Sequence, residues 1–75
     1  MSVTICWRPV GENSNHFEGG TSTELDCLER VFGKQVARSD VPRLRAMSVV
    51  SKSEFYNEVA DIVETTGAIE VWGQW

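Results

Sequence analysis

The stretch SKSEFYNEVADIVETTGAIEVW, residues 51–72, decides the fold because it combines the signals of a helix with those of a following strand. Ser51 and Glu54 have the spacing of a capping box, in which each side chain binds a free backbone N–H of the first helical turn. Four apolar residues then recur at the spacing of one helix face: Phe55, Val59, Ile62 and Val63. Gly67 occupies the position of a left-handed C-terminal cap, and residues 69–72 have the composition of a strand.

The predicted helix carries acidic side chains opposite its apolar side, at Glu54, Glu58 and Asp61, with Glu64 beside them. No lysine or arginine occurs between residues 53 and 75. Such a face can imitate a run of phosphates and attract a basic protein surface at long range. The alternative is an ordinary solvated helix face. A second acidic cluster favours the binding interpretation: Glu12, Glu18, Glu24, Asp26 and Glu29.

The N-terminal half predicts a strand, a loop and a helix. In residues 3–10 the side chains that would point to one side, Val3, Ile5 and Trp7, are all apolar, which predicts a strand. Pro9 either ends this strand or confines it to a sheet edge. Residues 11–20 are rich in turn-forming residues and predict a loop. Residues 21–32 predict a helix, with a capping box formed by Thr21 and Glu24 and a stop at Gly33.

The central residues predict a third, short helix. Asp40 followed by Val41 and Pro42 has the pattern of a helix start, so we expect a helix over residues 41–48. A short strand over residues 46–50 is the alternative.

Together these elements predict one small α+β domain over residues 1–75. We expect the terminal strands to pair in a two- or three-stranded antiparallel sheet, with two main helices packed on one face. A homodimer could extend the sheet across an exposed edge. The predicted core consists of Val3, Ile5, Trp7, Leu25, Leu28, Val31, Phe32, Leu44, Met47, Phe55, Val59, Ile62, Val63, Ile69 and Val71.

Length, charge and cysteine content limit the function. A chain of 75 residues buries only about 60% of its unfolded surface, which leaves little room for a large enzyme cleft. The net charge of −4 argues against direct nucleic-acid binding. No signal peptide and no membrane-spanning apolar run are found, so we expect a cytoplasmic protein in which Cys6 and Cys27 are reduced.

Neither catalysis nor metal binding has a recognisable motif. His16 lies near Glu12 and Glu18, but this spacing matches no known metal loop, and Cys6 and Cys27 form no CxxC pair. We therefore expect no catalytic residues, no metal and no cofactor.

Three arginines and two tryptophans remain as candidate binding residues. Arg38, Arg43 and Arg45 could hold an anion such as a phosphate or nucleotide, or they could pair with the flanking acidic residues. Trp72 and Trp75 lie where a chain end normally frays, so they need either internal packing or a partner.

The leading functional hypothesis is a non-enzymatic inhibitor or adaptor that engages a basic protein surface, such as the nucleic-acid groove of a host defence or transcription complex. Glu54, Glu58, Asp61 and Glu64 would supply the charge, and Trp72 and Trp75 would act as apolar anchors. In its short length, acidity and lack of catalytic motifs, the chain is similar to many small phage or mobile-element proteins that block host machinery. The alternatives are a small, dimeric anion-binding protein that uses the central arginines, and an assembly subunit.

Overall fold

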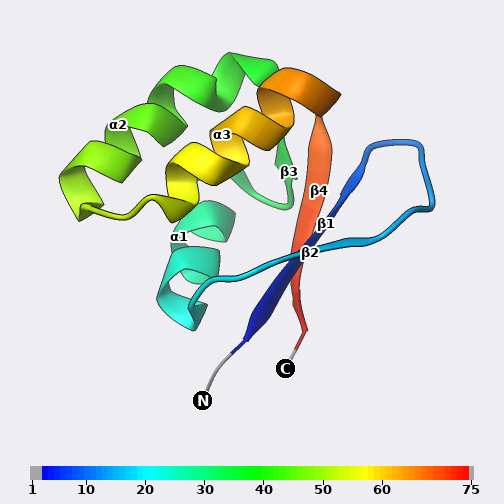
Figure 1. Ribbon diagram of the computed structural model, residues 1–75, viewed down its shortest axis with the longest axis horizontal. Coiled ribbons are helices and arrows are strands. Elements are labelled where there is room, and N and C mark those ends of the chain that lie inside the picture. Colours follow the sequence, from blue (N-terminus) through cyan, green and yellow to red (C-terminus); the bar gives the residue numbers. More distant parts are fainter. Residues whose placement is uncertain (1–2, 75) are drawn as a thin grey trace.

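The computed structural model describes residues 3–74 and shows three helices beside a four-stranded sheet (Figure 1). The elements in chain order are β1 (Thr4–Pro9), β2 (His16–Glu18), α1 (Ser22–Phe32), β3 (Gln35–Val36), the 3-10 helix η1 (Arg38–Asp40), α2 (Val41–Ser51), α3 (Phe55–Thr66) and β4 (Ile69–Gln74). Within residues 3–74, no helix has the length and apolar character needed to cross a bilayer.

The terminal strands β1 and β4 pair antiparallel along their whole length, which confirms the predicted closure of the fold. Their register runs from Thr4 opposite Gln74 to Pro9 opposite Ile69. Pro9 is the last residue of β1, so it ends the strand, and β1 is not an edge strand because β2 pairs with its other side.

The sheet has four strands in the order β2-β1-β4-β3, all antiparallel, where two or three strands were predicted. The two additional strands are very short and lie at the edges. The prediction of a loop throughout residues 11–20 was wrong over residues 16–18, because these residues take extended geometry by pairing with β1. Strands of two or three residues carry no periodic signal of their own.

Three helices contribute to the core instead of two main ones. α2 has 11 residues, as many as α1, and buries Leu44 completely. The predicted helix at residues 41–48 is therefore confirmed and extends to Ser51, and the alternative strand over residues 46–50 is wrong. α2 packs beside α3 at the periphery of the molecule (Figure 1).

Most of the predicted core is buried, and four of its members are partly buried against it: Trp7, Phe32, Met47 and Ile62. Val31 was wrongly placed in the core, because its side of α1 faces outward and leaves the residue 42% exposed. The core also includes residues that the pattern did not identify: Val36, Tyr56 and Ala60. Cys6 is buried as well, on the sheet face that carries Trp72.

The helix ends confirm the predicted capping box of α1 and the two glycine stops, but the left-handed conformation predicted for the cap at Gly67 was wrong. Thr21 and Glu24 form the capping box of α1, with the Thr21 N–H donating to Glu24 at 2.9 Å and the Glu24 N–H donating to Thr21 Oγ1 at 3.2 Å. Gly33 and Gly67 end α1 and α3 with φ of 78° and 96°. In both glycines ψ is extended, so they are positive-φ stops outside the left-handed helical region.

The predicted capping box of Ser51 and Glu54 was wrong. Ser51 is the last residue of α2, and α3 begins at Phe55. The intervening corner is held by Ser48, whose hydroxyl donates to the carbonyl of Ser53 at 2.7 Å and whose carbonyl accepts from the Ser53 N–H at 3.1 Å. Residues 51–54 therefore connect two helices.

Asp40 precedes α2 as predicted, but its side chain does not cap that helix. Its carboxylate instead accepts a hydrogen bond from the backbone N–H of Ala37 at 2.9 Å. The 3-10 helix η1 leads directly into α2 and brings Asp40 within reach of the residue three positions before it.

Polar groups at the edge of the core join α1 to α3. The Ser53 hydroxyl donates to Glu24, which links α1 to the corner before α3. Tyr56 of α3 is buried, and its pKa is raised to about 12, first by this burial and then by the nearby Cys27 and Glu24 of α1. Cys6 and Cys27 are separate free thiols, and burial raises the pKa of Cys6.

Neighbouring glycines in the connection between β2 and α1 provide a test of this packing. An added Cβ at Gly20 would lie 2.6 Å from Ile5 Cδ1 and 3.1 Å from Phe55 Cε1, and its φ of +155° is unfavourable for other residues. We expect Gly20→Ala to lower the free energy of unfolding by about 1–3 kcal/mol, since both neighbours are buried. Urea denaturation measures the change.

The adjacent variant Gly19→Ala is the matched control, because no atom lies within 4 Å of the added Cβ. It should leave stability unchanged within about 0.5 kcal/mol. Equal stability of the two variants would contradict the packing around Gly20.

Candidate interaction surface

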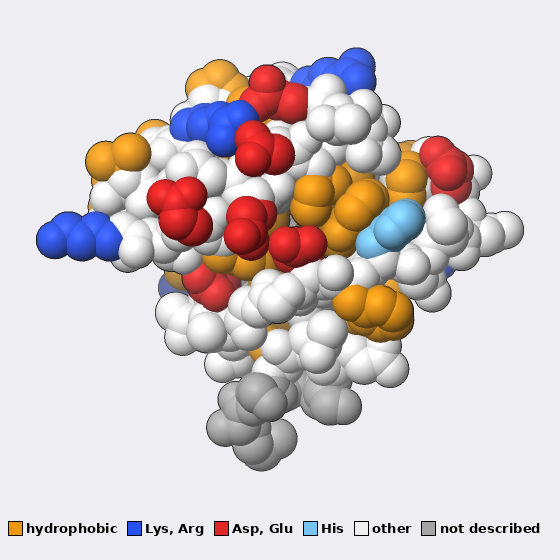
Figure 2. Space-filling model, viewed as in Figure 1, with side chains coloured by type: hydrophobic (Ala, Val, Ile, Leu, Met, Phe, Trp, Pro, Cys, Tyr) orange, Lys and Arg blue, Asp and Glu red, His pale blue; other side chains and the backbone are white. Residues whose placement is uncertain are grey.

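One face of the molecule carries an acidic surface that we define by five carboxylates. Figure 2 shows a row of acidic side chains gathered on one side of the protein. Three of them come from α3, one from the residue before it and one from β2: Glu58, Asp61 and Glu64, then Glu54, and Glu18. The predicted acidic face of α3 thus exists, and the fold adds to it.

Glu18 and Glu58 are neighbouring like charges on this surface. Glu18 lies opposite Ile5 in the β1–β2 register. The pKa of Glu18 is raised, first by burial and then by the nearby carboxyl of Glu58. Glu18 is half-buried, whereas Glu58 is exposed. The fold therefore brings two carboxyls near each other at the junction of the sheet and α3.

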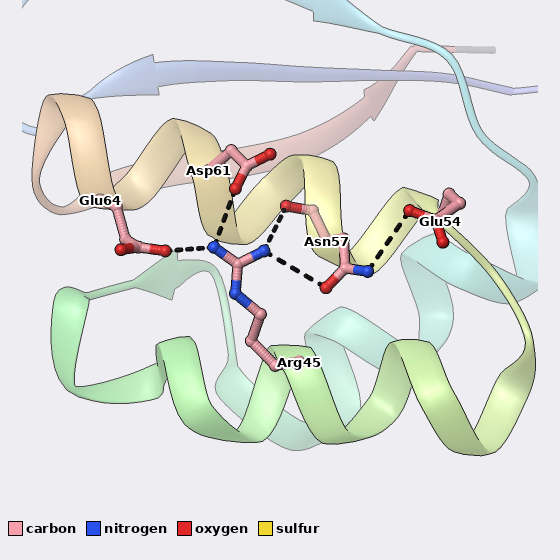
Figure 3. Close-up of polar contacts among 5 residues, drawn as sticks. All are labelled: Arg45, Glu54, Asn57, Asp61 and Glu64. Carbon is pink, nitrogen blue, oxygen red and sulfur yellow. Dashed lines mark hydrogen bonds and ion pairs between the residues drawn. The ribbon is translucent and has the colours of Figure 1, made fainter.

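Arg45 of α2 binds the other end of the acidic surface (Figure 3). Its guanidinium donates to Asp61 at 2.8 Å and also to Glu64, and it reaches the backbone carbonyl and the side-chain oxygen of Asn57 at 3.4 and 3.3 Å. These two carboxylates raise the pKa of Arg45. Asn57 in turn donates to Glu54 at 3.3 Å. One end of the surface is therefore partly neutralised, and Glu18 with Glu58 has no such partner among the ion pairs of residues 3–74.

Trp72 lies on the other side of the sheet from the acidic surface. It pairs with Cys6 across β1 and β4, whereas the alternate residues Val71 and Ile69 enter the core. The guanidinium of Arg8 lies 5.2 Å from the centre of the Trp72 ring. Trp72 is therefore not brought together with the acidic residues, and Trp75 lies outside the described residues.

Phe17 was not identified as a site residue, although it is one of the most exposed large apolar side chains. It pairs with Cys6 on the same sheet face as Trp72 and is 66% exposed. The only signal was an isolated aromatic residue in a segment rich in turn-forming residues. Its neighbour His16 lies on the opposite face and stacks on Trp7, with ring centres 4.3 Å apart.

The three arginines of the alternative anion site do not converge. Arg45 is directed toward α3, while Arg43, two residues along the same helix, is exposed. Arg38 is exposed in η1. Among residues 3–74, neither Arg38 nor Arg43 forms an ion pair.

In the described part of the chain, the candidate site is an open surface and not a pocket. Across residues 3–74 no pocket is found, and no three His, Cys, Asp or Glu side chains are placed to hold a metal ion. In comparisons with models of protein families, with curated proteins and with solved structures, no match was found.

Glu18 provides a pH-dependent test of the carboxyl pair. Because its pKa is higher in the folded state, the folded protein binds more protons than the unfolded chain, and this group lowers stability as the pH rises above its usual value of 4.5. We expect Glu18→Gln to raise the free energy of unfolding at neutral pH by about 0.5 kcal/mol. Urea denaturation between neutral pH and pH 4 should show this gain shrinking as the pH falls.

Glu12→Gln, an equal change in charge at an exposed loop residue, should give no comparable gain. A gain from Glu18→Gln that stays constant down to pH 4 would exclude the carboxyl pair as its cause.

Arg45 provides a second test, of the bridge between α2 and α3. We expect Arg45→Met to lower the melting temperature, since it removes the donor to Asp61 and Glu64 while keeping most of the side-chain stem. The loss should shrink in high salt, because the ion pairs are largely exposed.

Arg43→Met is the matched control on the same helix and should change the melting temperature much less. If the two variants melt alike at low salt, the Arg45 bridge contributes nothing to stability. Calorimetry of dilute samples measures both.

Proposed function

We propose that the protein is a non-enzymatic inhibitor or adaptor whose acidic surface binds a basic surface of a partner protein. The observation that carries the proposal is the proximity of Glu18 and Glu58, two carboxyls from separate elements, which raises the pKa of Glu18. A like-charge pair of this kind opposes folding at neutral pH. Lysine or arginine side chains of a partner would relieve the repulsion and gain charge-assisted hydrogen bonds.

The spacing of the carboxylates supports a partner that normally binds nucleic acid. Glu54, Glu58 and Asp61 follow one another at four and three residues, so α3 presents one charge per about 5 Å of helix axis. One DNA strand presents a charge per about 3.4 Å. Glu18 adds a fourth charge beside Glu58 and brings the local density closer to that of DNA.

In its specific form, the proposal is that the acidic surface occupies the nucleic-acid groove of a host defence or transcription complex, as a phage-type antagonist would. Long-range attraction between opposite charges would speed the encounter and make the complex sensitive to salt. Arg45 would hold the surface in place, since it ties α3 to α2 and leaves Glu18 and Glu58 free.

The test is capture by the tagged protein from the cell in which it acts, with washes at about 50 mM and about 500 mM NaCl. We expect wild type to retain a nucleic-acid-binding protein at low salt and to lose it at high salt or when heparin is added. The variant Glu18→Gln/Glu58→Gln should retain much less of that protein, because it lacks the two central charges.

Glu12→Gln/Glu29→Gln is the matched control, since it makes the same change in net charge at two exposed positions outside the acidic surface. It should retain the partner as wild type does. The proposal would be refuted if the partner stayed bound at high salt, or if the Glu18→Gln/Glu58→Gln variant captured as much of it as wild type.

A further inference from the structure

The outer face of α2 is unusually apolar for an exposed helix surface. Val49 and Val50 are 77% and 82% exposed, the highest values among the exposed large apolar residues of the described chain. Pro42 and Ala46 are exposed on the same helix, and Arg43 is the only charged residue among them. Exposed apolar side chains that adjoin one another on one element are typical of an interaction surface.

The buried side of the same helix is already occupied. Leu44 and Ser48 are buried, and Arg45 reaches across to α3. The exposed valines are therefore not available to the core of their own molecule. They form a second surface on the solvent-exposed side of α2.

We propose that this outer face of α2 binds the same face of a second copy, with the two helices antiparallel about a two-fold axis at Ala46. Four exposed positions of α2 are placed symmetrically about Ala46, three and four residues before and after it: Pro42, Arg43, Val49 and Val50. Ser51, the last residue of the helix, is exposed without an exposed counterpart. An antiparallel pair therefore places Val50 of each copy against Pro42 of the other. The small side chain of Ala46 lets the helices approach closely at the axis.

Charge at the helix ends favours the second copy over other occupants. α2 carries an acidic residue at its N-terminal cap and a basic residue at its C-terminal cap, Asp40 and Lys52, so its two ends have opposite charges. In the antiparallel pair, Arg43 of one copy approaches the last turn of the other. Lys52, just beyond the end of α2, lies opposite Asp40 at the start of the second helix.

The dimer should be weak, because an 11-residue helix presents a face only about 16 Å long. The contact therefore falls in the size class of transient interfaces, and association requires high protein concentration. Glu18 and Glu58 lie on β2 and α3, outside the contact proposed for α2, so the two proposals can fail independently.

Sedimentation velocity from about 10 μM to about 1 mM, with NMR shifts recorded over the same range, tests the proposal. We expect wild type to move from monomer toward dimer, with concentration-dependent shifts centred on residues 42–52. Val50→Asp should remain monomeric throughout. Val31→Asp makes the same change at an exposed valine of α1 and should dimerise like wild type.

A wild-type protein that stays monomeric at about 1 mM overturns the proposal and leaves the face to some other partner. The proposal is also overturned if the Val50→Asp variant still dimerises, or if the NMR shifts of the dimer map to the sheet face that carries Phe17 and Trp72. Both variants are first checked for a native melting transition. If Val50→Asp is unfolded, Val50→Ser replaces it with the same expected loss.

Discussion

The antiparallel pairing of β1 with β4 is the constraint on which the rest of the structure depends. It joins the two ends of the chain in one register, with Thr4 opposite Gln74 and Pro9 opposite Ile69. A shift of that register by one residue would turn Ile5 away from the helices and bring polar residues into the core. Each central strand also offers one free edge, and β2 and β3 form only because those edges are present.

The acidic surface follows from this arrangement and not from α3 alone. The β1–β2 register directs Glu18 to the side of the sheet that the core occupies, where α3 also lies, and Glu18 comes near Glu58 there. At the other end of the surface, Arg45 draws Asp61 and Glu64 toward α2. One end of the acidic surface is thus partly neutralised by Arg45, whereas the charges of Glu18 and Glu58 at the other end repel. The second end has more electrostatic energy to gain from a cationic partner.

α2 divides the molecule between two kinds of surface. Its inner side supplies Leu44 to the core and Arg45 to α3, and its outer side exposes Val49 and Val50. Because hydrophobic residues lie on both sides, helical periodicity alone does not reveal which side is buried. A small domain has too little interior to cover every apolar residue, and those left outside become surfaces for other molecules.

Local signals in the sequence determined the terminal strands, the positions of the three helices, and the stops at Gly33 and Gly67, since caps and apolar periodicity act between residues close in the chain. They also indicated most of the core and the acid-rich side of α3. Only the tertiary structure decided β2 and β3, the exposure of Val31, the use of Ser51 to end α2, and the proximity of Glu18 to Glu58. Each of these depends on residues that are distant in the chain or on competition between adjacent helices, and neither leaves a periodic pattern in the sequence.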